Sequence, residues 1–393
     1  MNILWLASWF PNRTGITNGD FIERHAKAVA PFVDSLTIIA AVKDEQLPYN
    51  AVDIVERKES NITAYIIYYG RSRWGGAAEK FLSLKKYVSL QLDLFEKIKN
   101  EKGLPGLVHV HVAMKSGLVA KKIKQQYNIP YIVTEHWTGY YKEAQPNIFE
   151  TGSYFARQAK SVLKNASLLL TVSNDLGNAI SKNLLPVAYK VVPNAVDTNL
   201  FFPSERTQSN SIKLVHISNM LYQKNAEAII EALAIWKKRG GEFSIQVFGP
   251  TSKAVALLVE KNGLQSEVTF NGEVLQAELC DAVKQADALV LYSRYETFGC
   301  VIIEANACGT PVIVSDIPVF HELVTEKENG VFVQQDKPGA LATAFENFDK
   351  TKSNFNREKI AAAAKERFCY NTVGRQIREV YNEVLETNQW LLR

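Results

Sequence analysis

Two glutamates, Glu296 and Glu304, stand eight positions apart in the segment RYETFGCVIIE. The run Ala288–Leu291 before them is typical of a buried strand, and Thr297–Cys300 is expected to begin a helix that ends at Gly309. A helix that begins directly after a parallel strand points its first backbone amides at an anion such as phosphate. The pattern therefore predicts a phosphate site with a carboxylate on either side. The alternative is a helix with a solvated glutamate at each end.

The first amides of this helix belong to Phe298, Gly299 and Cys300, which we predict hold phosphate oxygens. Glu304 lies one turn after Cys300 on the same helical face, within reach of the hydroxyls of a sugar attached to that phosphate. Glu296 precedes the helix and is expected to lie near whatever extends beyond the phosphate.

Histidines follow or end the expected strands of the first half. His136 comes directly after one strand, where the ligand loops of a parallel sheet emerge. His109 and His111 end another, and we expect only one of them to face the ligand. A metal site of these three is disfavoured because no carboxylate pattern accompanies it. Arg24 is a further candidate for contact with a ligand, although it and His25 are expected on a solvated helix face. For each of the other histidines the alternative is a buried packing role.

Glycines follow several expected strands. Gly15 and Gly19 flank the loop between the first strand and the first helix, and Gly249 and Asn271–Gly272 end two later strands. Glycine lets a backbone approach a ligand closely, so these turns are candidate ligand contacts. Tight turns alone would also explain them.

The elements that must position these residues occur in two stretches of alternating strands and helices, from Asn2 to about Val192 and again from about Ile212. Such alternation predicts an α/β class with two Rossmann-like domains, each a parallel sheet covered on both faces. The expected domains are 1–195 and 196–370, with a helix at 371–393 that returns to the first. Pro193–Ser211 is the expected linker. The expected strands are Ile3–Ser8, Leu36–Val42, Ala64–Tyr69, Leu107–His111, Tyr131–Thr134, Leu168–Val172, Lys190–Val192, Lys213–Ile217, Ser244–Phe248, Val268–Asn271, Ala288–Leu291, Pro311–Val314 and Gly330–Val333.

The composition excludes several classes of protein. The net charge of +4 on 393 residues is too small for a dedicated nucleic-acid binder. Apolar runs are much shorter than the ~18 residues that cross a membrane, and MNILWLASWF is typical of a buried strand rather than a signal peptide. The four cysteines form no CxxC pair, which predicts reduced thiols and a cytoplasmic location. No G-x-G-x-x-G string is present, which disfavours a dinucleotide-dependent oxidoreductase.

Several segments of the sequence, taken in order, resemble those of the retaining glycosyltransferases of family 4. That family has the GT-B fold, in which two Rossmann-like domains face a central cleft. SRYETFG followed by EANACGTPVI resembles the family's E-x7-E segment, and LVHISNMLYQKN resembles its donor loop, GR-x-x-x-x-KG. VTEHWTG resembles the acceptor-side histidine segment, and VVPNAVDTNLF the linker. SWFPNRTGITNGDFIERHAKAV resembles the N-terminal glycine loop and helix, so the resemblance covers nearly the whole chain.

The resemblance implies that a nucleotide sugar binds the second domain and an acceptor the first. Glu304 would hold the ribose, Glu296 the transferred sugar and Lys224 the leaving diphosphate, while His136 would face the transferred sugar. The implied catalytic residues are His136, Glu296 and Lys224, and the other implied donor-binding residues are Gly19, Ser218, Asn219, Gly249, Asn271, Phe298, Gly299, Cys300 and Glu304. The implied acceptor-side residues are His109, His111 and Arg24.

The donor loop departs from the family pattern. Ser218 and Asn219 stand where the family has glycine and arginine, so one of its two usual cations is absent. Arg294 or Lys253 could substitute. No two aspartates have the D-x-D spacing that binds a divalent ion in many glycosyltransferases of the other large fold. We therefore expect no metal and no cofactor, because Lys224 and the helix amides stabilise the leaving group.

The expected function is transfer of a hexose or N-acetylhexosamine, with retention of configuration, from a UDP- or GDP-linked donor to an acceptor hydroxyl. The resemblance places such transfer in the polysaccharide or glycolipid biosynthesis of a bacterial cell, with a sugar or a lipid-linked sugar as acceptor. An inactive nucleotide-sugar-binding protein, an epimerase and a phosphorylase of the same fold are the alternatives.

Basic and aromatic side chains gather between Arg71 and Lys99, in the domain expected to bind the acceptor. They are Arg71, Arg73, Trp74, Lys80, Phe81, Lys85, Lys86 and Tyr87. This mixture suits an anionic lipid-linked acceptor and predicts peripheral contact with the inner face of the cell membrane. An ordinary surface helix with snorkelling lysines is the alternative, because Glu79, Asp93 and Glu96 dilute the charge.

Overall fold

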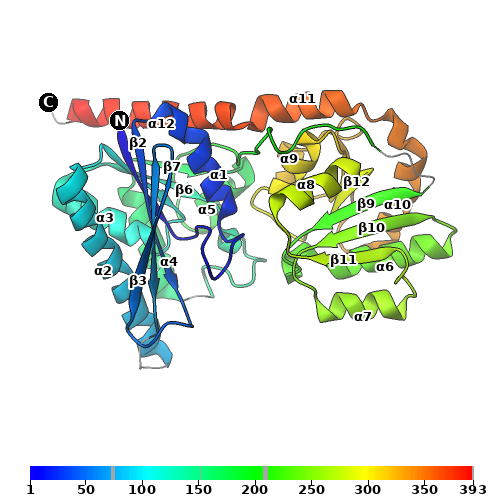
Figure 1. Cartoon of the computed structure of the whole chain (residues 1–393), viewed down its shortest axis with the longest axis horizontal. Coiled ribbons are helices and arrows are strands. Elements are labelled where there is room, and N and C mark those ends of the chain that lie inside the picture. The colour runs from blue at the N-terminus through cyan, green and yellow to red at the C-terminus, as the bar shows by residue number, and fades with distance from the viewer. Residues whose placement is uncertain (72–75, 151, 207–210, 392–393) are drawn as a thin grey trace. The chain divides into compact units, whose positions relative to one another are not determined.

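The computed structural model describes residues 1–71, 76–150, 152–206 and 211–391 (Figure 1). The chain divides into two compact units, one of residues 1–195 with 370–393 and one of residues 196–369. Each unit is a largely parallel sheet with interleaved helices, which confirms the predicted α/β class. Arg73 and Trp74 of the basic and aromatic stretch lie outside the described residues.

Eight strands form one sheet in the described part of the first unit. In spatial order they are β3 (Val52–Glu59), β4 (Ile62–Tyr69), β2 (Ser35–Lys43), β1 (Asn2–Ala7), β5 (Leu107–His111), β6 (Tyr131–Glu135), β7 (Leu168–Thr171) and β8 (Tyr189–Val191). Neighbouring strands run parallel except β3 and β4. Because parallel strands end at one edge of a sheet, the residues after β1, β5 and β6 emerge together.

Helices cover both faces of this sheet. They are α1 (Asp20–Val29), α2 (Gly76–Lys102), α3 (Ser116–Tyr127), α4 (Ser153–Asn165), α5 (Asn174–Asn183) and α12 (Tyr370–Leu391). Helices α2 and α3 lie on one side of the sheet and α1 on the other (Figure 1). Helix α12 packs on α1 so closely that a Cβ at Gly374 would lie 1.9 Å from the carbonyl oxygen of Ala28. The buried Trp5 indole donates a hydrogen bond to the Tyr381 hydroxyl of α12 (2.9 Å), which ties this helix to the sheet.

The second unit has a six-stranded parallel sheet in its described part. Its strands, in spatial order, are β11 (Val268–Gly272), β10 (Phe243–Phe248), β9 (Ile212–Ile217), β12 (Ala288–Leu291), β13 (Val312–Ser315) and β14 (Gly330–Val333). Its helices are α6 (Ala226–Lys238), α7 (Lys253–Lys261), α8 (Gln276–Gln285), α9 (Cys300–Ala307), α10 (Pro338–Thr351) and α11 (Arg357–Phe368). Helix α6 packs against α7 and α10, and α9 packs against α8 and α11.

One strand was absent from the expected strands, and one helix of the same unit has an unusual composition. Strand β3 reads VDIVERKE, with four charged residues in succession at its end, and lies at the edge of the sheet with most of its residues exposed, so it lacks the apolar run of a buried strand. Helix α5 contains Gly177 and three asparagines, which are poor helix formers, and Ser173 caps it by accepting a hydrogen bond from the Leu176 amide.

Candidate functional site

The segment between β12 and α9 carries the residues of the predicted anion site, all in the second unit. Gly299, with φ of 104°, is the N-cap of α9, and Cys300 is its first residue. This left-handed backbone suits glycine, and a Cβ there would also lie 3.0 Å from the Phe320 ring. The first turn of α9 therefore follows the carboxyl end of β12, with Glu304 one turn further and only 2% exposed.

Glu296 lies in the loop before α9 and is 6% exposed. Its carboxylate accepts hydrogen bonds from the ammonium of Lys224 (2.5 Å), from Nε2 of Gln223 (2.9 Å) and from the hydroxyl of Ser293 (2.9 Å). Lys224 ends the short 3-10 helix Tyr222–Lys224 that follows β9, so the fold joins residues 72 positions apart. The result is a partly buried cation held by Glu296, three residues before the N-cap of α9.

The donor-loop residues Ser218 and Asn219 have local partners. The Ser218 hydroxyl lies 2.9 Å from Nε2 of His216 and accepts from the Met220 amide (3.1 Å). Asn219 is exposed, and its side-chain oxygen accepts from the Leu221 amide. Neither supplies a positive charge.

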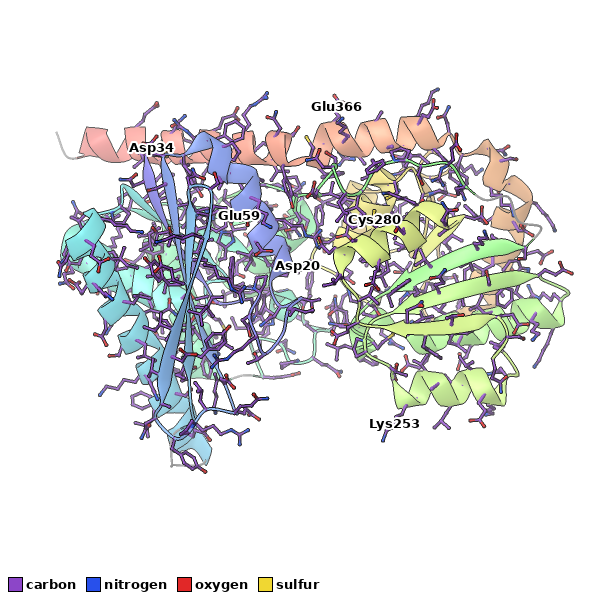
Figure 2. All side chains as sticks on the ribbon, in the orientation of Figure 1. Asp20, Asp34, Glu59, Lys253, Cys280 and Glu366 are labelled. Atoms are coloured by element: carbon purple, nitrogen blue, oxygen red, sulfur yellow. The ribbon has the colours of Figure 1, made fainter. Side chains whose placement is uncertain are left out.

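Of the two cations proposed to replace the missing arginine, Arg294 lies beside Lys224. Its guanidinium stacks on the Tyr222 ring at 4.1 Å and donates to the Tyr222 carbonyl, and its amide donates to the Gln223 carbonyl (2.8 Å). Lys253 is exposed at the start of α7 (Figure 2). The structure therefore favours Arg294.

Gly249 and Asn271 mark the carboxyl ends of β10 and β11. A Cβ at Gly249, where φ is 125°, would lie 1.8 Å from the Ser218 carbonyl oxygen, so this glycine is required by the packing of the two loops. The side-chain nitrogen Nδ2 of Asn271 is buried and has no hydrogen-bond partner among the described residues.

In the first unit, the strand ends bring His111 and His136 together. Nδ1 of His111 lies 3.2 Å from Nε2 of His136, and His136 is 6% exposed. His109 is fully buried, and both its nitrogens are used, by the Tyr381 hydroxyl (2.8 Å) and the Thr134 hydroxyl (2.6 Å). His109 is therefore a packing residue in this structure.

His109 and His111 share one face of β5, because residues two apart in a strand point the same way, and their ring centroids lie 4.3 Å apart. One expectation for this region was wrong. His25 and Arg24 are not on a solvated face, since they are 1% and 6% exposed. Nε2 of His25 lies 3.0 Å from the Pro193 carbonyl oxygen, and Arg24 pairs with Asp20.

Burial controls the charge of these histidines. Burial lowers the pKa of His25 to about 4, and it lowers the pKa of His109, His111 and His136 well below the ordinary value. The imidazoles are therefore neutral at pH 7. The neutral His136 can donate a hydrogen bond to a hydroxyl or accept one from it, but it supplies no positive charge.

Gly19 is explained by the fold of the first unit. Its φ is 76°, and a Cβ there would lie 2.6 Å from the carbonyl carbon of Trp9. Close packing at the start of α1 thus requires glycine, whether or not a ligand approaches the same loop.

The sequence reasoning missed three polar residues, of which Ser293 and Glu135 are buried and Gln223 is partly exposed. Gln223 and Ser293 bind Glu296, and each directly adjoins a residue that the motif had singled out. Glu135 is fully buried, and burial raises its pKa to about 7. It accepts hydrogen bonds from the Ala113 amide and the Tyr140 hydroxyl (2.7 Å each), which joins the loops after β5 and β6. The position of Glu135 directly before His136 was the one feature of the sequence that could have pointed to it.

The basic and aromatic stretch is only partly a surface. Tyr87 is 2% exposed, and its hydroxyl lies 2.7 Å from that of Ser116, so it belongs to the core and not to a membrane-facing patch. Phe81 and Lys85 are exposed, and they line a groove of about 480 Å³ shared by α2, α3 and α4. None of the helices in the described residues is long and apolar enough to cross a membrane.

Two family profiles match the chain. The one described as Glycosyl transferases group 1 matches residues 197–367, and the one described as Glycosyltransferase Family 4 matches residues 51–200. D-inositol 3-phosphate glycosyltransferase of Paenarthrobacter aurescens is 28% identical over 210 residues, which are 50% of this chain and 52% of that one, so the chain matches about half the length of that relative.

Solved structures show the same fold. Sucrose-phosphate synthase of Thermosynechococcus elongatus is similar with a TM-score of 0.80 at 18% identity, over 98% of this chain and 100% of that one. HepE of Anabaena in complex with UDP-glucose is similar with a TM-score of 0.70 at 19% identity, over the same shares. Similarity over nearly the whole chain to these structures confirms the expected GT-B fold.

Proposed function

Because the chain belongs to the group 1 glycosyltransferases, we propose that it transfers a sugar from a nucleotide sugar to an acceptor hydroxyl. The observation that carries this proposal is the joining of Lys224, Glu296 and the first turn of α9 in the second unit. A nucleotide sugar has negatively charged phosphates for the ammonium and the helix amides, ribose hydroxyls for Glu304, and hydroxyls of the transferred sugar for Glu296. The neighbour that binds UDP-glucose supports a nucleotide-sugar donor.

We propose that each residue of this cluster has one role. The amides of Phe298, Gly299 and Cys300 bind the phosphates, and Glu304 binds the ribose. Lys224 stabilises the charge that grows on the diphosphate as the bond to the sugar breaks. Arg294, beside Lys224, is the candidate for a second cation. Cation and amides together make a divalent metal unnecessary for transfer.

The proposed stereochemistry is retention. Glu296 already accepts hydrogen bonds from three donors, so its carboxylate suits the orientation of Lys224 and of the sugar better than the removal of a proton. His136 is the candidate for a hydrogen bond to the transferred sugar from the first unit. As a neutral imidazole it can donate or accept that bond.

The acceptor proposal rests on the groove shared by α2, α3 and α4. Phe81, Leu84 and Leu92 give it an apolar lining, and Lys85, Lys121 and Lys122 stand beside them. Apolar and cationic side chains in one groove suit an acceptor with a lipid tail and an anionic head group. Peripheral contact with a membrane surface is proposed on the same ground.

A thermal-shift screen of the full chain against UDP-glucose, UDP-N-acetylglucosamine, GDP-mannose and NAD⁺ tests this function. A nucleotide sugar at 100 times its Kd should stabilise the chain by ~2.7 kcal/mol, and NAD⁺ should not. Mass spectrometry of a transfer reaction with the donor found in this way then tests activity. Donor binding with neither sugar transfer nor slow hydrolysis of the donor would indicate an inactive binding protein. Phosphate-dependent release of a sugar phosphate would indicate a phosphorylase.

A further inference from the structure

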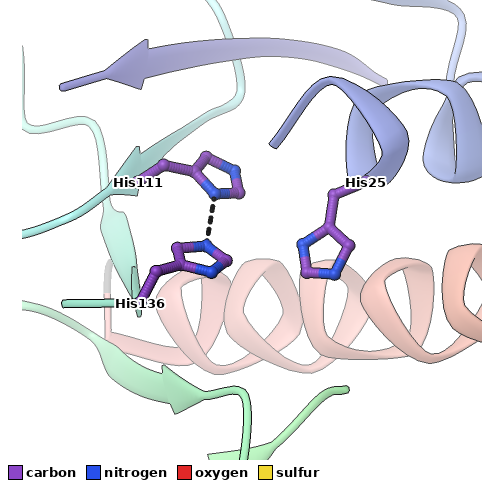
Figure 3. A group of neighbouring side chains, drawn as sticks. All are labelled: His25, His111 and His136. Atoms are coloured by element: carbon purple, nitrogen blue, oxygen red, sulfur yellow. Dashed lines mark hydrogen bonds between the residues drawn. The ribbon is translucent and has the colours of Figure 1, made fainter. Parts of the chain in front are cut away.

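Three histidines from three elements of the first unit converge. His25 comes from α1, His111 from the last position of β5 and His136 from the position after β6. One ring nitrogen of each lies within 4.8 Å of a ring nitrogen of the other two. Figure 3 shows the rings of His111 and His136 side by side with the ring of His25 facing them.

Each of these imidazoles has one nitrogen in a hydrogen bond and one buried nitrogen without a partner among the described residues. The unpartnered atoms are Nδ1 of His25, Nε2 of His111 and Nδ1 of His136. Buried polar atoms almost always have a partner, so three in one cluster indicate a missing group. The Pro193 carbonyl can only accept, so Nε2 of His25 carries the proton and Nδ1 keeps its lone pair.

The three imidazole nitrogens determine which kind of ligand could fill this cluster. Three imidazoles without a thiolate or carboxylate favour zinc, copper, nickel or cobalt over magnesium or calcium. Glu135 is the nearest carboxylate in the sequence, but it is already bound by the Ala113 amide and the Tyr140 hydroxyl. A hydrogen bond from a ligating histidine to a backbone carbonyl, as His25 makes to Pro193, is the usual support of such sites.

We propose that His25, His111 and His136 bind a divalent transition metal of the zinc class, and that this metal inhibits rather than assists the chain's activity. The metal replaces the 3.2 Å hydrogen bond between His111 and His136, because both must direct a lone pair at the ion. Bound metal takes His136 away from any sugar. That consequence rests on the proposed function, whereas metal binding itself does not. His109 takes no part, since both its nitrogens are used elsewhere.

Cobalt is the probe for this site. The full chain is treated with a chelator, dialysed and titrated with Co²⁺, and the visible absorption of four-coordinate cobalt is followed. We expect one equivalent to bind, to be displaced by Zn²⁺, and not to be displaced by Mg²⁺. His25→Gln should weaken cobalt binding by at least about 100-fold. Loss of a residue that only hydrogen-bonds to a metal ligand already lowers metal affinity by about 10–100-fold, and His25 is proposed to bind the metal directly. His321→Gln, an exposed histidine paired with Asp316, is the matched control and should bind as the wild type does.

The site is wrong if the wild type gives no four-coordinate cobalt spectrum, or if His25→Gln binds cobalt as tightly as the wild type. If His25→Gln fails to fold by circular dichroism, His136→Gln provides the same comparison. In the transfer assay, Zn²⁺ should inhibit the wild type reversibly and His25→Gln much less, while the basal rates match. Inhibition that is equal in both proteins would refute the inhibitory role. Tight cobalt binding in a chain that transfers no sugar would instead refute only the proposed function.

Discussion

Replacing Lys224 by methionine removes the cation that we assign to the leaving diphosphate while keeping most of the side-chain volume. The ammonium is held by Glu296 at 2.5 Å, with the two side chains 17% and 6% exposed. At an effective dielectric constant near 20, a unit charge about 4 Å from a phosphate oxygen contributes about 4 kcal/mol. The pairing with Glu296 offsets part of this, so we expect a loss of about 3 kcal/mol, or roughly 100-fold in turnover.

The loss should appear in kcat rather than in the affinity for the donor. Negative charge on the diphosphate grows as the bond to the sugar breaks, so the ammonium interacts more strongly with the transition state than with the bound donor. Initial rates at varied donor concentration separate the two effects, and calorimetry with the nucleoside diphosphate gives its Kd directly. Circular dichroism must accompany both measurements to show that the variant folds. Without Lys224, the buried Glu296 carboxylate keeps only the neutral donors Gln223 and Ser293, which can destabilise the fold.

Lys237→Met is the matched control. Lys237 lies on α6 of the same unit and pairs with Glu267 at 2.7 Å, but it is 38% exposed and belongs to no predicted site. It should lose an ion pair of the same kind with turnover unchanged. The reasoning is refuted if Lys224→Met turns over as fast as Lys237→Met, or if its whole defect lies in donor affinity.

Glu304→Ala should weaken nucleotide binding by roughly 10- to 100-fold, since a hydrogen bond to a charged group contributes ~1.5–3 kcal/mol; unchanged binding by calorimetry would remove Glu304 from the site. Transfer should continue in excess EDTA, and loss of activity that only Mg²⁺ or Mn²⁺ restores would contradict the metal-independent proposal. Proton NMR of the first product should show an α-glycoside from an α-linked donor, and a β-linked product would overturn retention. Burial lowers the pKa of His216 to about 4, so the unfolded state binds more protons and stability falls as the pH drops from about 6.5 to 4, by about 3 kcal/mol in all. His216→Asn can keep the bond to the Val290 carbonyl without this titration, so urea unfolding of this variant should depend less on pH, and an equal dependence would show that other groups cause it.

Most of the fold could be predicted from the sequence because its signals are local. A buried parallel strand is a short apolar run, and the helix after it has a different period, so both can be recognised within about ten residues. The segment Ala288–Leu291, followed by Gly299 and α9, was predicted in this way and is confirmed. Strand β3 was missed because an exposed edge strand has no apolar run.

The partners within the site depend on the tertiary structure. The bonds from Gln223 and Lys224 to Glu296 span more than 70 positions, and no local pattern records which side chains meet when β9 and β12 pair side by side. The sequence could place Lys224 near the diphosphate only through the family resemblance. It gave no sign that Glu296 holds this lysine.

The histidines show the same division. Their positions at strand ends and on a helix follow from the sequence, and these positions indicated that His136 lies near a ligand. Burial of His25, the engagement of both nitrogens of His109 and the convergence of His25 with His111 and His136 were decided by packing. Residue type and spacing determine which element a side chain occupies, whereas its solvation, its partners and hence its charge depend on what the rest of the chain packs against it.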